Sequence, residues 1–158
     1  SYMNIVRALI HVQEHLSYGY RRTWKPRMKL LIADDSRVVR ERLSLLLSQL
    51  ENIEIIGYAG TVQKAIDLVA ELKPDLIILD IKMPGGCGID VLENIKSNGK
   101  GPIVMMLTNY SYPQYQKKCI DAGADYFFDK SAEFELAIDT IRSLASFKEF
   151  QPNYTKEV

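Results

Sequence analysis

The chain has 158 residues, of which 47% are hydrophobic and 25% charged, and its formal net charge is zero. This composition is typical of a single soluble globular domain, and it excludes disordered and collagen-like proteins. No apolar run approaches the roughly 20 residues that span a bilayer, and the first residues lack the apolar core of a signal peptide. We therefore expect a cytoplasmic protein that does not bind membranes.

The distribution of charge and the cysteines bear on nucleic-acid binding and on the redox compartment. Residues 1–27 carry five Lys or Arg and one Glu, a net charge of +4, which leaves −4 for the rest of the chain. A basic tail on an acidic domain is more often solubilising or structural than nucleic-acid binding, so we expect no nucleic-acid contact through the domain. Cys87 and Cys119 form neither a disulfide framework nor a metal-ligand set with His11 and His15, which fits a reducing compartment.

Residues 1–27 form a segment of their own at the start of the chain. Helical spacing is compatible with part of a set of apolar residues there, namely Ile5, Val6, Leu9, Ile10, Val12 and Leu16. Residues 17–20 and Lys25-Pro26 would end such a helix. Two interpretations stay open: a docking or dimerising helix, or a non-native extension outside the domain proper, because Met28 could itself be the natural start.

From Lys29 onward, short apolar runs alternate with longer segments that have apolar residues at helical spacing. The apolar runs are Leu30–Ala33, Ile53–Tyr58, Leu76–Leu79, Ile103–Leu107 and Tyr126–Phe128. The helical segments carry Val39, Leu43, Leu46 and Leu50; Val62, Ala65, Ile66, Val69 and Leu72; Ile89, Leu92 and Ile95; Tyr112, Tyr115, Cys119 and Ala122; and Phe134, Ala137, Ile138, Ile141 and Leu144. This alternation predicts the α/β class, a doubly wound parallel sheet with helices on both faces.

Boundary signals agree with this pattern. Ser36 and Thr61 are predicted N-caps, because each precedes a helical segment and offers a side-chain oxygen to unpaired N–H groups. Lys73-Pro74 is expected to end the second helix. Five strand–helix units then occupy residues 28–147, and the polar residues 148–158 are expected to form a C-terminal tail.

Residues of distinct chemistry stand where the predicted strands end. The first strand is followed by Asp34 and Asp35, the third by Asp80 and the fifth by Lys130, while Thr108 closes the fourth. Each of these residues alone would be an ordinary cap, turn or solvated charge. Because the ends of parallel strands open onto one edge, where ligands of α/β sheets bind, the set together predicts a functional site.

The predicted site suits phosphoryl chemistry. Three carboxylates in a small pocket repel one another, so without a counterion at least one should have a raised pKa. All-oxygen ligation, with no His or Cys at the strand ends, favours Mg²⁺ or Mn²⁺. Lys130 adds positive charge and the Thr108 hydroxyl offers a donor, so the pocket fits transfer of a phosphoryl group to an oxygen of Asp80.

The order of these motifs resembles that of a bacterial response-regulator receiver domain over residues 28–147: Asp34-Asp35, Asp80 with Met83-Pro84 and Gly88, then Thr108 and Lys130. The resemblance implies a flavodoxin-like sheet of strand order 2-1-3-4-5. It also implies a phosphorylation switch of a two-component system or phosphorelay, which takes its phosphoryl group from a phosphohistidine with Mg²⁺ bound. Such a domain catalyses only its own phosphorylation and dephosphorylation.

Carried over by position, the resemblance implies a role for each acidic residue. Asp80 would be the phospho-acceptor, and a sensor histidine kinase or a phosphotransfer protein would be its partner. Asp35 would bind Mg²⁺ directly and Asp34 would help through water. The backbone carbonyl of Lys82 would complete the protein ligands.

The same resemblance implies how the signal leaves the site. Thr108 and Lys130 would hold the phosphoryl group, and Phe127 would be the aromatic switch that turns inward when Thr108 moves. Phosphorylation would then shift the conformation of the face made by the fourth helix, the fifth strand and the fifth helix, and so control a downstream partner. A plain core position is the other interpretation of Phe127.

Several positions depart from the family pattern. Ser131 follows Lys130 where the family often has proline with a cis peptide, and a cis bond before another residue costs about 2.5–4 kcal/mol, so we expect this loop to differ. Asn109 stands where a small residue is common, which predicts slower autodephosphorylation than with alanine there. Lys82 either pairs with a carboxylate or faces solvent.

Three aromatic residues begin the fourth helical segment: Tyr110, Tyr112 and Tyr115. They predict either a partner surface or a locally packed helix start, because exposed aromatics mark interfaces but the sequence does not show burial.

The sequence is compatible with four functions to different degrees. The first is a stand-alone receiver that binds a partner or passes on a phosphoryl group. The second is the receiver part of a longer regulator with a DNA-binding helix-turn-helix or an enzymatic output. A phosphatase would usually carry a second carboxylate two residues after its nucleophile, where Lys82 stands. A degenerate scaffold is argued against by the complete acidic set.

Overall fold

A computed structural model describes residues 27–97, 99 and 101–149. Residues 1–26 and 150–158, which carry most of the predicted N-terminal extension and C-terminal tail, lie outside the described residues. The predicted domain bounds, 28–147, therefore stay a prediction.

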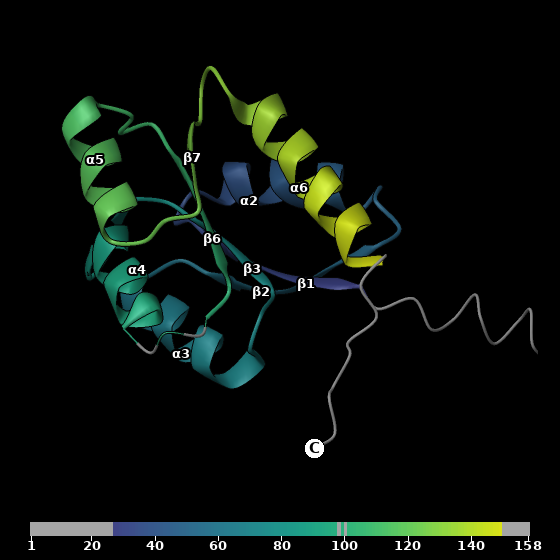
Figure 1. The fold of residues 1–158 in the computed structure, drawn as a ribbon, viewed down its shortest axis with the longest axis horizontal. Coiled ribbons are helices and arrows are strands. Elements are labelled where there is room, and N and C mark those ends of the chain that lie inside the picture. The colour runs from purple at the N-terminus through teal and green to yellow at the C-terminus, as the bar shows by residue number, and fades with distance from the viewer. Residues whose placement is uncertain (1–26, 98, 100, 150–158) are drawn as a thin grey trace, which may run out of the picture.

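The five longer strands alternate with helices along the described chain, as the sequence predicted (Figure 1), and two short strands stand between the third of them and the next helix. The strands are β1 (Met28–Ala33), β2 (Ile53–Ala59), β3 (Leu76–Leu79), β4 (Lys82–Met83), β5 (Gly86–Cys87), β6 (Ile103–Thr108) and β7 (Tyr126–Asp129). The helices are α2 (Arg37–Leu47), α3 (Val62–Leu72), α4 (Gly88–Lys96), α5 (Pro113–Asp121) and α6 (Phe134–Glu149).

The five longer strands form one parallel sheet in the order β2-β1-β3-β6-β7. Counted among themselves along the chain, these strands have the predicted order 2-1-3-4-5. The separate antiparallel hairpin of β4 and β5 was not predicted, because two residues per strand are too few to show a periodic pattern.

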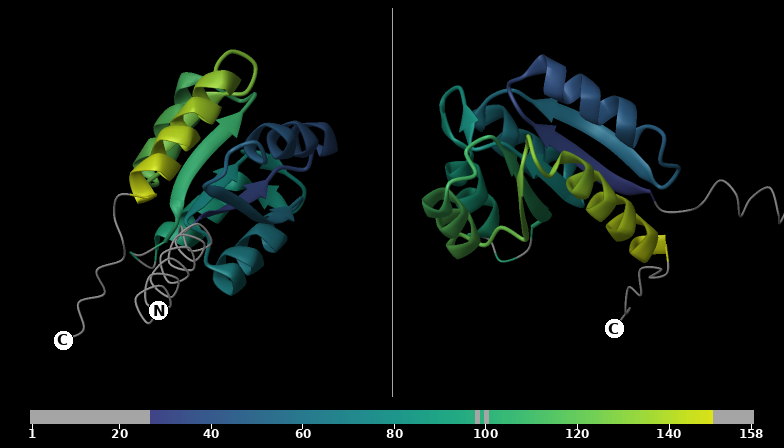
Figure 2. Two further views of the ribbon diagram at one scale, coloured as in Figure 1. Left: turned by 90° about the vertical axis from the view of Figure 1, so that its right-hand side faces the viewer. Right: turned by 90° about the horizontal axis from the view of Figure 1, so that it is seen from above.

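Helices cover both faces of the sheet (Figure 2). Side chains of α2 and α6 pack with one set of strand residues, including Leu30, Ile78 and Met105. Side chains of α3, α4 and α5 pack with the alternate set, including Leu31 and Ile77. Because successive strand residues point to opposite faces, the uninterrupted apolar runs of the sequence supply both cores.

Helix ends follow the predicted signals. The Ser36 side chain accepts a hydrogen bond from the Val39 amide at 3.4 Å, and Thr61 accepts one from Lys64 at 3.2 Å. Helix α3 ends before Lys73, which takes a left-handed conformation with φ of 46°. These caps fix where α2 and α3 start beside the carboxyl ends of β1 and β2.

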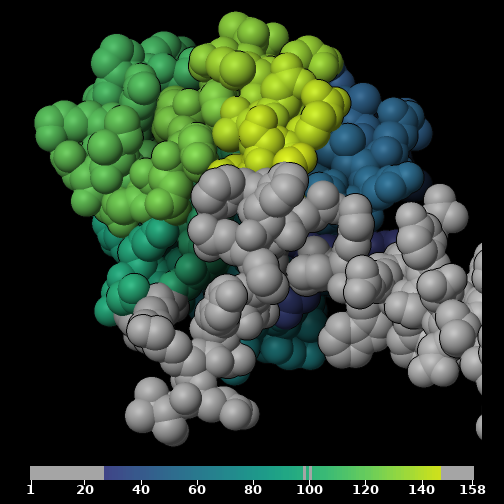
Figure 3. Space-filling model, turned by 45° about the vertical axis from the view of Figure 1, so that its right-hand side comes forward, coloured from purple at the N-terminus to yellow at the C-terminus, as the bar shows by residue number. Residues whose placement is uncertain are grey.

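The surface view places α6 between the segments of α2 and α5 (Figure 3). On the side of α2, the Arg42 guanidinium lies 3.9 Å from the centre of the Phe134 ring, which joins the two helices. None of the described helices combines the length and the apolar character of a membrane-spanning segment.

Candidate acidic site at the carboxyl edge of the sheet

Two adjacent carboxylates leave the end of β1. The Asp34 side chain is buried, and its Oδ1 accepts a hydrogen bond from the Ser36 amide at 2.8 Å. The carbonyl oxygen of Asp34 accepts another from Arg40 Nη1 at 3.1 Å. Asp35 is exposed. The start of α2 therefore holds Asp34 firmly and leaves Asp35 open to solvent.

The third carboxylate follows β3. Asp80 is 7% exposed and its Oδ1 accepts a hydrogen bond from the Ile81 amide at 2.8 Å. The first residue of α4, Gly88, packs directly against it: a Cβ at position 88 would lie 1.8 Å from the Asp80 carbonyl oxygen. Only glycine fits this approach, which the hydrogen bond from the Gly88 amide to the Ile81 carbonyl oxygen, at 2.6 Å, maintains.

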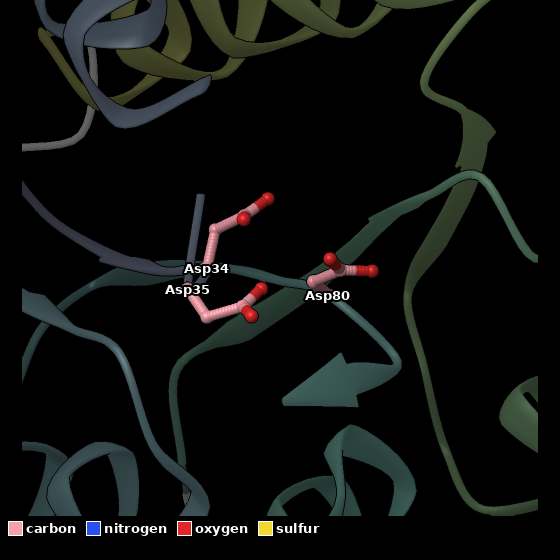
Figure 4. A group of neighbouring side chains, drawn as sticks. All are labelled: Asp34, Asp35 and Asp80. Atoms are coloured by element: carbon pink, nitrogen blue, oxygen red, sulfur yellow. The ribbon is translucent and has the colours of Figure 1, made fainter. Parts of the chain in front are cut away.

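These three carboxylates come together, as Figure 4 shows. One oxygen from each of Asp34, Asp35 and Asp80 lies within 4.8 Å of the others. The Lys130 ammonium donates to Asp34 Oδ2 at 2.7 Å and to Asp80 Oδ2 at 3.0 Å. Four of the five predicted site residues therefore meet at this edge of the sheet.

Burial and the shared lysine act in opposite directions on the charges. Burial raises the pKa of Asp34, and the hydrogen bond from Lys130 offsets only part of that rise. Burial alone would lower the pKa of Lys130, but hydrogen bonds and attraction from Asp34 and Asp80 outweigh it, so this pKa is raised. Lys130 thus stays protonated and acts as a counterion inside the cluster.

A pocket of about 440 Å³ opens over the carboxylates. Its wall includes Lys82, Asn109 and Tyr110 besides the acidic residues and Lys130. Thr108 is fully buried, and its hydroxyl oxygen accepts a hydrogen bond from the Tyr110 amide at 3.1 Å. The fifth predicted residue therefore lies in the protein interior at the end of β6, with its hydroxyl tied to the following loop.

A family model described as the response regulator receiver domain matches residues 30–142. That match covers most of the chain, including both acidic strand ends, Thr108 and Lys130. The chain belongs to the response regulator receiver domain family. The family resemblance drawn from the sequence is thereby confirmed.

Two relatives are named as transcriptional regulatory proteins. The chain is 33% identical over 129 residues, 81% of its length, to the uncharacterized transcriptional regulatory protein YvfU of Bacillus subtilis. It is 35% identical over 127 residues, 76% of its length, to the transcriptional regulatory protein PdtaR of Mycobacterium tuberculosis. The matches span 64% and 61% of those proteins, so the chain corresponds to less than two thirds of either relative.

Solved structures share this receiver fold. A DNA-binding response regulator of the LuxR family from Staphylococcus aureus superposes with a TM-score of 0.69 at 28% identity, covering 75% of this chain and 98% of that chain. The CheX-CheY-BeF3-Mg+2 complex from Borrelia burgdorferi gives a TM-score of 0.67 at 28% identity, covering 74% and 88%. The response regulator domain of Thermotoga maritima CheB, at 23% identity and a TM-score of 0.68, shows the fold alone.

The aromatic residues of this receiver are mostly packed locally. The rings of Tyr110 and Tyr115 meet edge to face with centroids 6.2 Å apart, and both residues pack against the core on the side of α5. Tyr112 is 59% exposed. Phe127 is half-buried against the same core. A partner surface of tyrosines and a switching role of Phe127 stay predictions.

Lys82 faces solvent, the second of its two predicted environments. Its ammonium lies 5.5 Å from the centre of the Tyr110 ring. The Tyr110 side chain, with a smaller attraction from Asp35, raises the pKa of Lys82. Lys82 therefore adds positive charge at the rim of the pocket.

Two supporting residues were not identified from the sequence. Arg40 donates a hydrogen bond to the Asp34 carbonyl oxygen. The available signal was that Arg40 stands four residues after the cap Ser36, one helical turn further along the chain. Asp129 accepts hydrogen bonds from the Ser131 and Ala132 amides, an Asx turn that could have been suspected from Asp129-Lys130-Ser131. The Lys130–Ser131 peptide is trans.

Proposed function

We propose that Asp80 accepts a phosphoryl group from a phosphohistidine of a sensor histidine kinase or a phosphotransfer protein. The observation that carries this proposal is the convergence of three carboxylates, from Asp34, Asp35 and Asp80, with the Lys130 ammonium in contact with two of them, Asp34 and Asp80. A structural ion pair needs one carboxylate, whereas three around an open pocket leave negative charge that a bound cation would neutralise.

Asp80 acts as the nucleophile in this reaction. One of its carboxylate oxygens attacks the phosphorus atom, a P–O bond forms, and the P–N bond to the donor imidazole breaks. The electron pair of that bond stays on the imidazole nitrogen, which takes up a proton. The Lys130 ammonium then binds the phosphoryl oxygens instead of the carboxylates. The Thr108 hydroxyl donates a hydrogen bond to one of the phosphoryl oxygens.

The donor set fits a small, hard cation. Carboxylate oxygens from Asp34, Asp35 and Asp80 are ligands that Mg²⁺ prefers, and Mn²⁺ is the alternative. Lys82 lies in the pocket wall, and its backbone carbonyl would be the further ligand that the family resemblance implies. When bound, the cation neutralises charge on the transferred group. Asp34 and Asp80 are held by backbone amides, which keeps them oriented for this role.

Signal output follows from the elements that hold the phosphoryl group. Thr108 ends β6 and Lys130 follows β7, so their movement toward Asp80 displaces the loop that starts α5 and the loop that starts α6. We assign the face of α5, β7 and α6, with Phe127 as its switch, to a downstream protein partner. The domain changes only its own phosphorylation state and is otherwise not an enzyme.

A DNA-binding output is the second candidate. It is favoured by the names of relatives, which are transcriptional regulatory proteins, and by the fact that the chain corresponds to less than two thirds of their length. In that case the receiver face would regulate an output domain of the same protein rather than a separate partner.

Intact mass after exposure to phosphoramidate and Mg²⁺ tests the proposed function. The wild type should gain the mass of one phosphoryl group, and Asp80→Asn should gain none. Asp125→Asn, at the opposite edge of the sheet, is the matched control and should be modified like the wild type. A gain that persists in Asp80→Asn, or none in the wild type over a range of phosphodonors, contradicts the proposal.

A further inference from the structure

Asp129 fixes the backbone on both sides of Lys130. Its Oδ1 accepts hydrogen bonds from the amides of Ser131 and Ala132, both at 2.8 Å. The Glu133 amide donates to the Asp129 carbonyl oxygen at 2.9 Å, and the Asp129 amide donates to Glu133 Oε1 at 3.0 Å. The turn that follows β7 is therefore closed around the carboxylate of the residue next to Lys130.

The same turn is tied to the loop that follows β6. Asp129 Oδ2 accepts a hydrogen bond from the Ser111 hydroxyl, and the Ser131 hydroxyl donates to Asn109 Oδ1 at 3.1 Å. The Lys130 amide donates to the Thr108 carbonyl oxygen at 2.9 Å. Residues 108–111 and 129–131 thus share three hydrogen bonds, two of them between side chains.

The Asp129 carboxylate is well suited to join two loops. It uses one oxygen within its own turn and the other across the gap to Ser111. The Ser111 hydroxyl, followed by the Ala132 amide, holds the pKa of Asp129 below its usual value. The group is therefore ionised at neutral pH, where a carboxylate makes stronger hydrogen bonds than a neutral acceptor.

We infer that Asp129 is a positioning residue that joins the Thr108 loop and the Lys130 loop into one unit. The inference rests on the proposed function, in which Thr108 and Lys130 hold the same phosphoryl group. Two donors on separate loops grip one anion well only if their separation is fixed before the anion arrives. The ladder of β6 and β7, which pairs Thr108 with Asp129, aligns the two strand ends. The Asp129 carboxylate extends this connection beyond the ladder, into the loops that carry Ser111 and Ser131.

The simpler alternative is that Asp129 only caps the turn before α6. Both accounts expect Asp129→Ala to loosen residues 131–133. Only a positioning role predicts that Asp129→Ala also loosens residues 109–112, in the loop after β6. Only a positioning role predicts that Ser111→Ala weakens binding of the phosphoryl group, because Ser111 takes no part in the Asp129 turn. The two variants therefore separate the accounts.

Amide hydrogen exchange without any phosphodonor gives the first test. Asp129→Ala should speed exchange about fivefold both at Ser131 and Ala132 and in residues 109–112, the change expected for loss of one hydrogen bond. Ser111→Ala should speed exchange in residues 109–112 alone. Unchanged exchange of residues 109–112 in both variants overturns the inference, whatever the phosphorylation experiments give.

The affinity for beryllofluoride with Mg²⁺, a mimic of the phosphoryl group, gives the second test. We expect affinity to fall about tenfold in Asp129→Ala and about threefold in Ser111→Ala. The double variant should bind no more weakly than Asp129→Ala, because both changes remove the same connection. Losses that multiply in the double variant, or an unchanged affinity in Asp129→Ala, overturn the inference.

Asp125→Asn is the matched control at the other end of β7. Asp125 Oδ2 accepts hydrogen bonds from the Val104 amide and Lys96 Nζ, both at 2.8 Å. This variant should keep wild-type affinity for beryllofluoride, and an equal loss in Asp125→Asn assigns the effect to β7 stability and overturns the inference. A wild type that is neither phosphorylated nor binds beryllofluoride contradicts the proposed function instead, while the exchange result still decides whether the loops are joined.

Discussion

Aspartates lie at both ends of the parallel strands, which we call the amino edge and the carboxyl edge of the sheet, but their roles differ. At the amino edge, Asp75 Oδ2 accepts a hydrogen bond from the Lys29 amide at 2.7 Å. Asp125 bridges the Val104 amide and the Lys96 ammonium. Each of these carboxylates binds a backbone N–H that a neighbouring strand leaves unpaired, which holds the ends of the strands in register.

At the carboxyl edge the carboxylates converge on one another. Asp34, Asp35 and Asp80 line one pocket, and Asp34 and Asp80 share the Lys130 ammonium. The side chains of Asp34 and Asp80 are 4% and 9% exposed, against 40% for Asp125. Burying carboxylates close together costs free energy, so their presence here indicates a functional site. An aspartate that binds a backbone amide at the start of a strand has a structural role.

The largest contrast between the edges is expected from their lysines. Lys130→Met leaves Asp34 and Asp80 buried without a counterion and should lower the free energy of unfolding by about 3–5 kcal/mol in EDTA. Lys96→Met, at the half-exposed pair with Asp125, should cost less than about 1 kcal/mol. Urea denaturation measures both, and equal losses would contradict the distinction drawn between the edges.

Replacing a glycine should also have different effects on stability at the two edges. Gly88→Ala places a methyl group against the Asp80 carbonyl oxygen and should cost about 3 kcal/mol, with loss of phosphorylation because Asp80 is displaced. Gly99→Ala meets no atom within 4 Å and is strained only by its φ of 69°, so it should cost about 1 kcal/mol and leave phosphorylation unchanged. Urea midpoints and intact mass check both variants.

Cation binding should stabilise the carboxyl edge alone. At 100 times its dissociation constant, Mg²⁺ should add about 2.7 kcal/mol to the free energy of unfolding of the wild type. Asp35→Ala should remove this gain and change stability in EDTA by less than about 0.5 kcal/mol, because Asp35 is exposed. A full Mg²⁺ gain in Asp35→Ala would exclude that residue as a ligand.

The smallest effect is expected at the amino edge. Asp125→Asn keeps an oxygen for the Val104 amide and loses only the charge that pairs with Lys96, so it should cost less than about 1 kcal/mol. Its Mg²⁺ gain should equal that of the wild type. A reduced gain in the same titration would mean that the two edges are coupled.

The sequence was a good guide wherever a residue's position along a strand decides its place. Apolar runs gave all five sheet strands, and Asp34, Asp80 and Lys130 meet because the ends of parallel strands share one edge. The caps Ser36 and Thr61 followed from local hydrogen-bonding chemistry in the same way.

What escaped prediction depends on contacts between loops. The hydroxyl of Ser111 reaches Asp129 across 18 residues of sequence, and Ser131 reaches Asn109 across 22, distances over which no periodic pattern carries information. The open choice at Lys82 had the same cause, because its ammonium lies near the ring of Tyr110, a residue distant in the sequence. Local pattern fixes the framework, and side-chain contacts between loops complete the site.

The single lysine among three carboxylates also affects how a phosphodonor reaches the pocket. The carboxylates outnumber the lysines that line the pocket, Lys130 and Lys82, so a phosphorylated donor, which is itself negative, would be repelled on approach. A cation bound by these carboxylates would reduce this repulsion, and so would raise the rate of encounter as well as the rate of transfer. Without the cation, added salt should speed the encounter, since screening weakens repulsion beyond the Debye length of about 8 Å at physiological ionic strength.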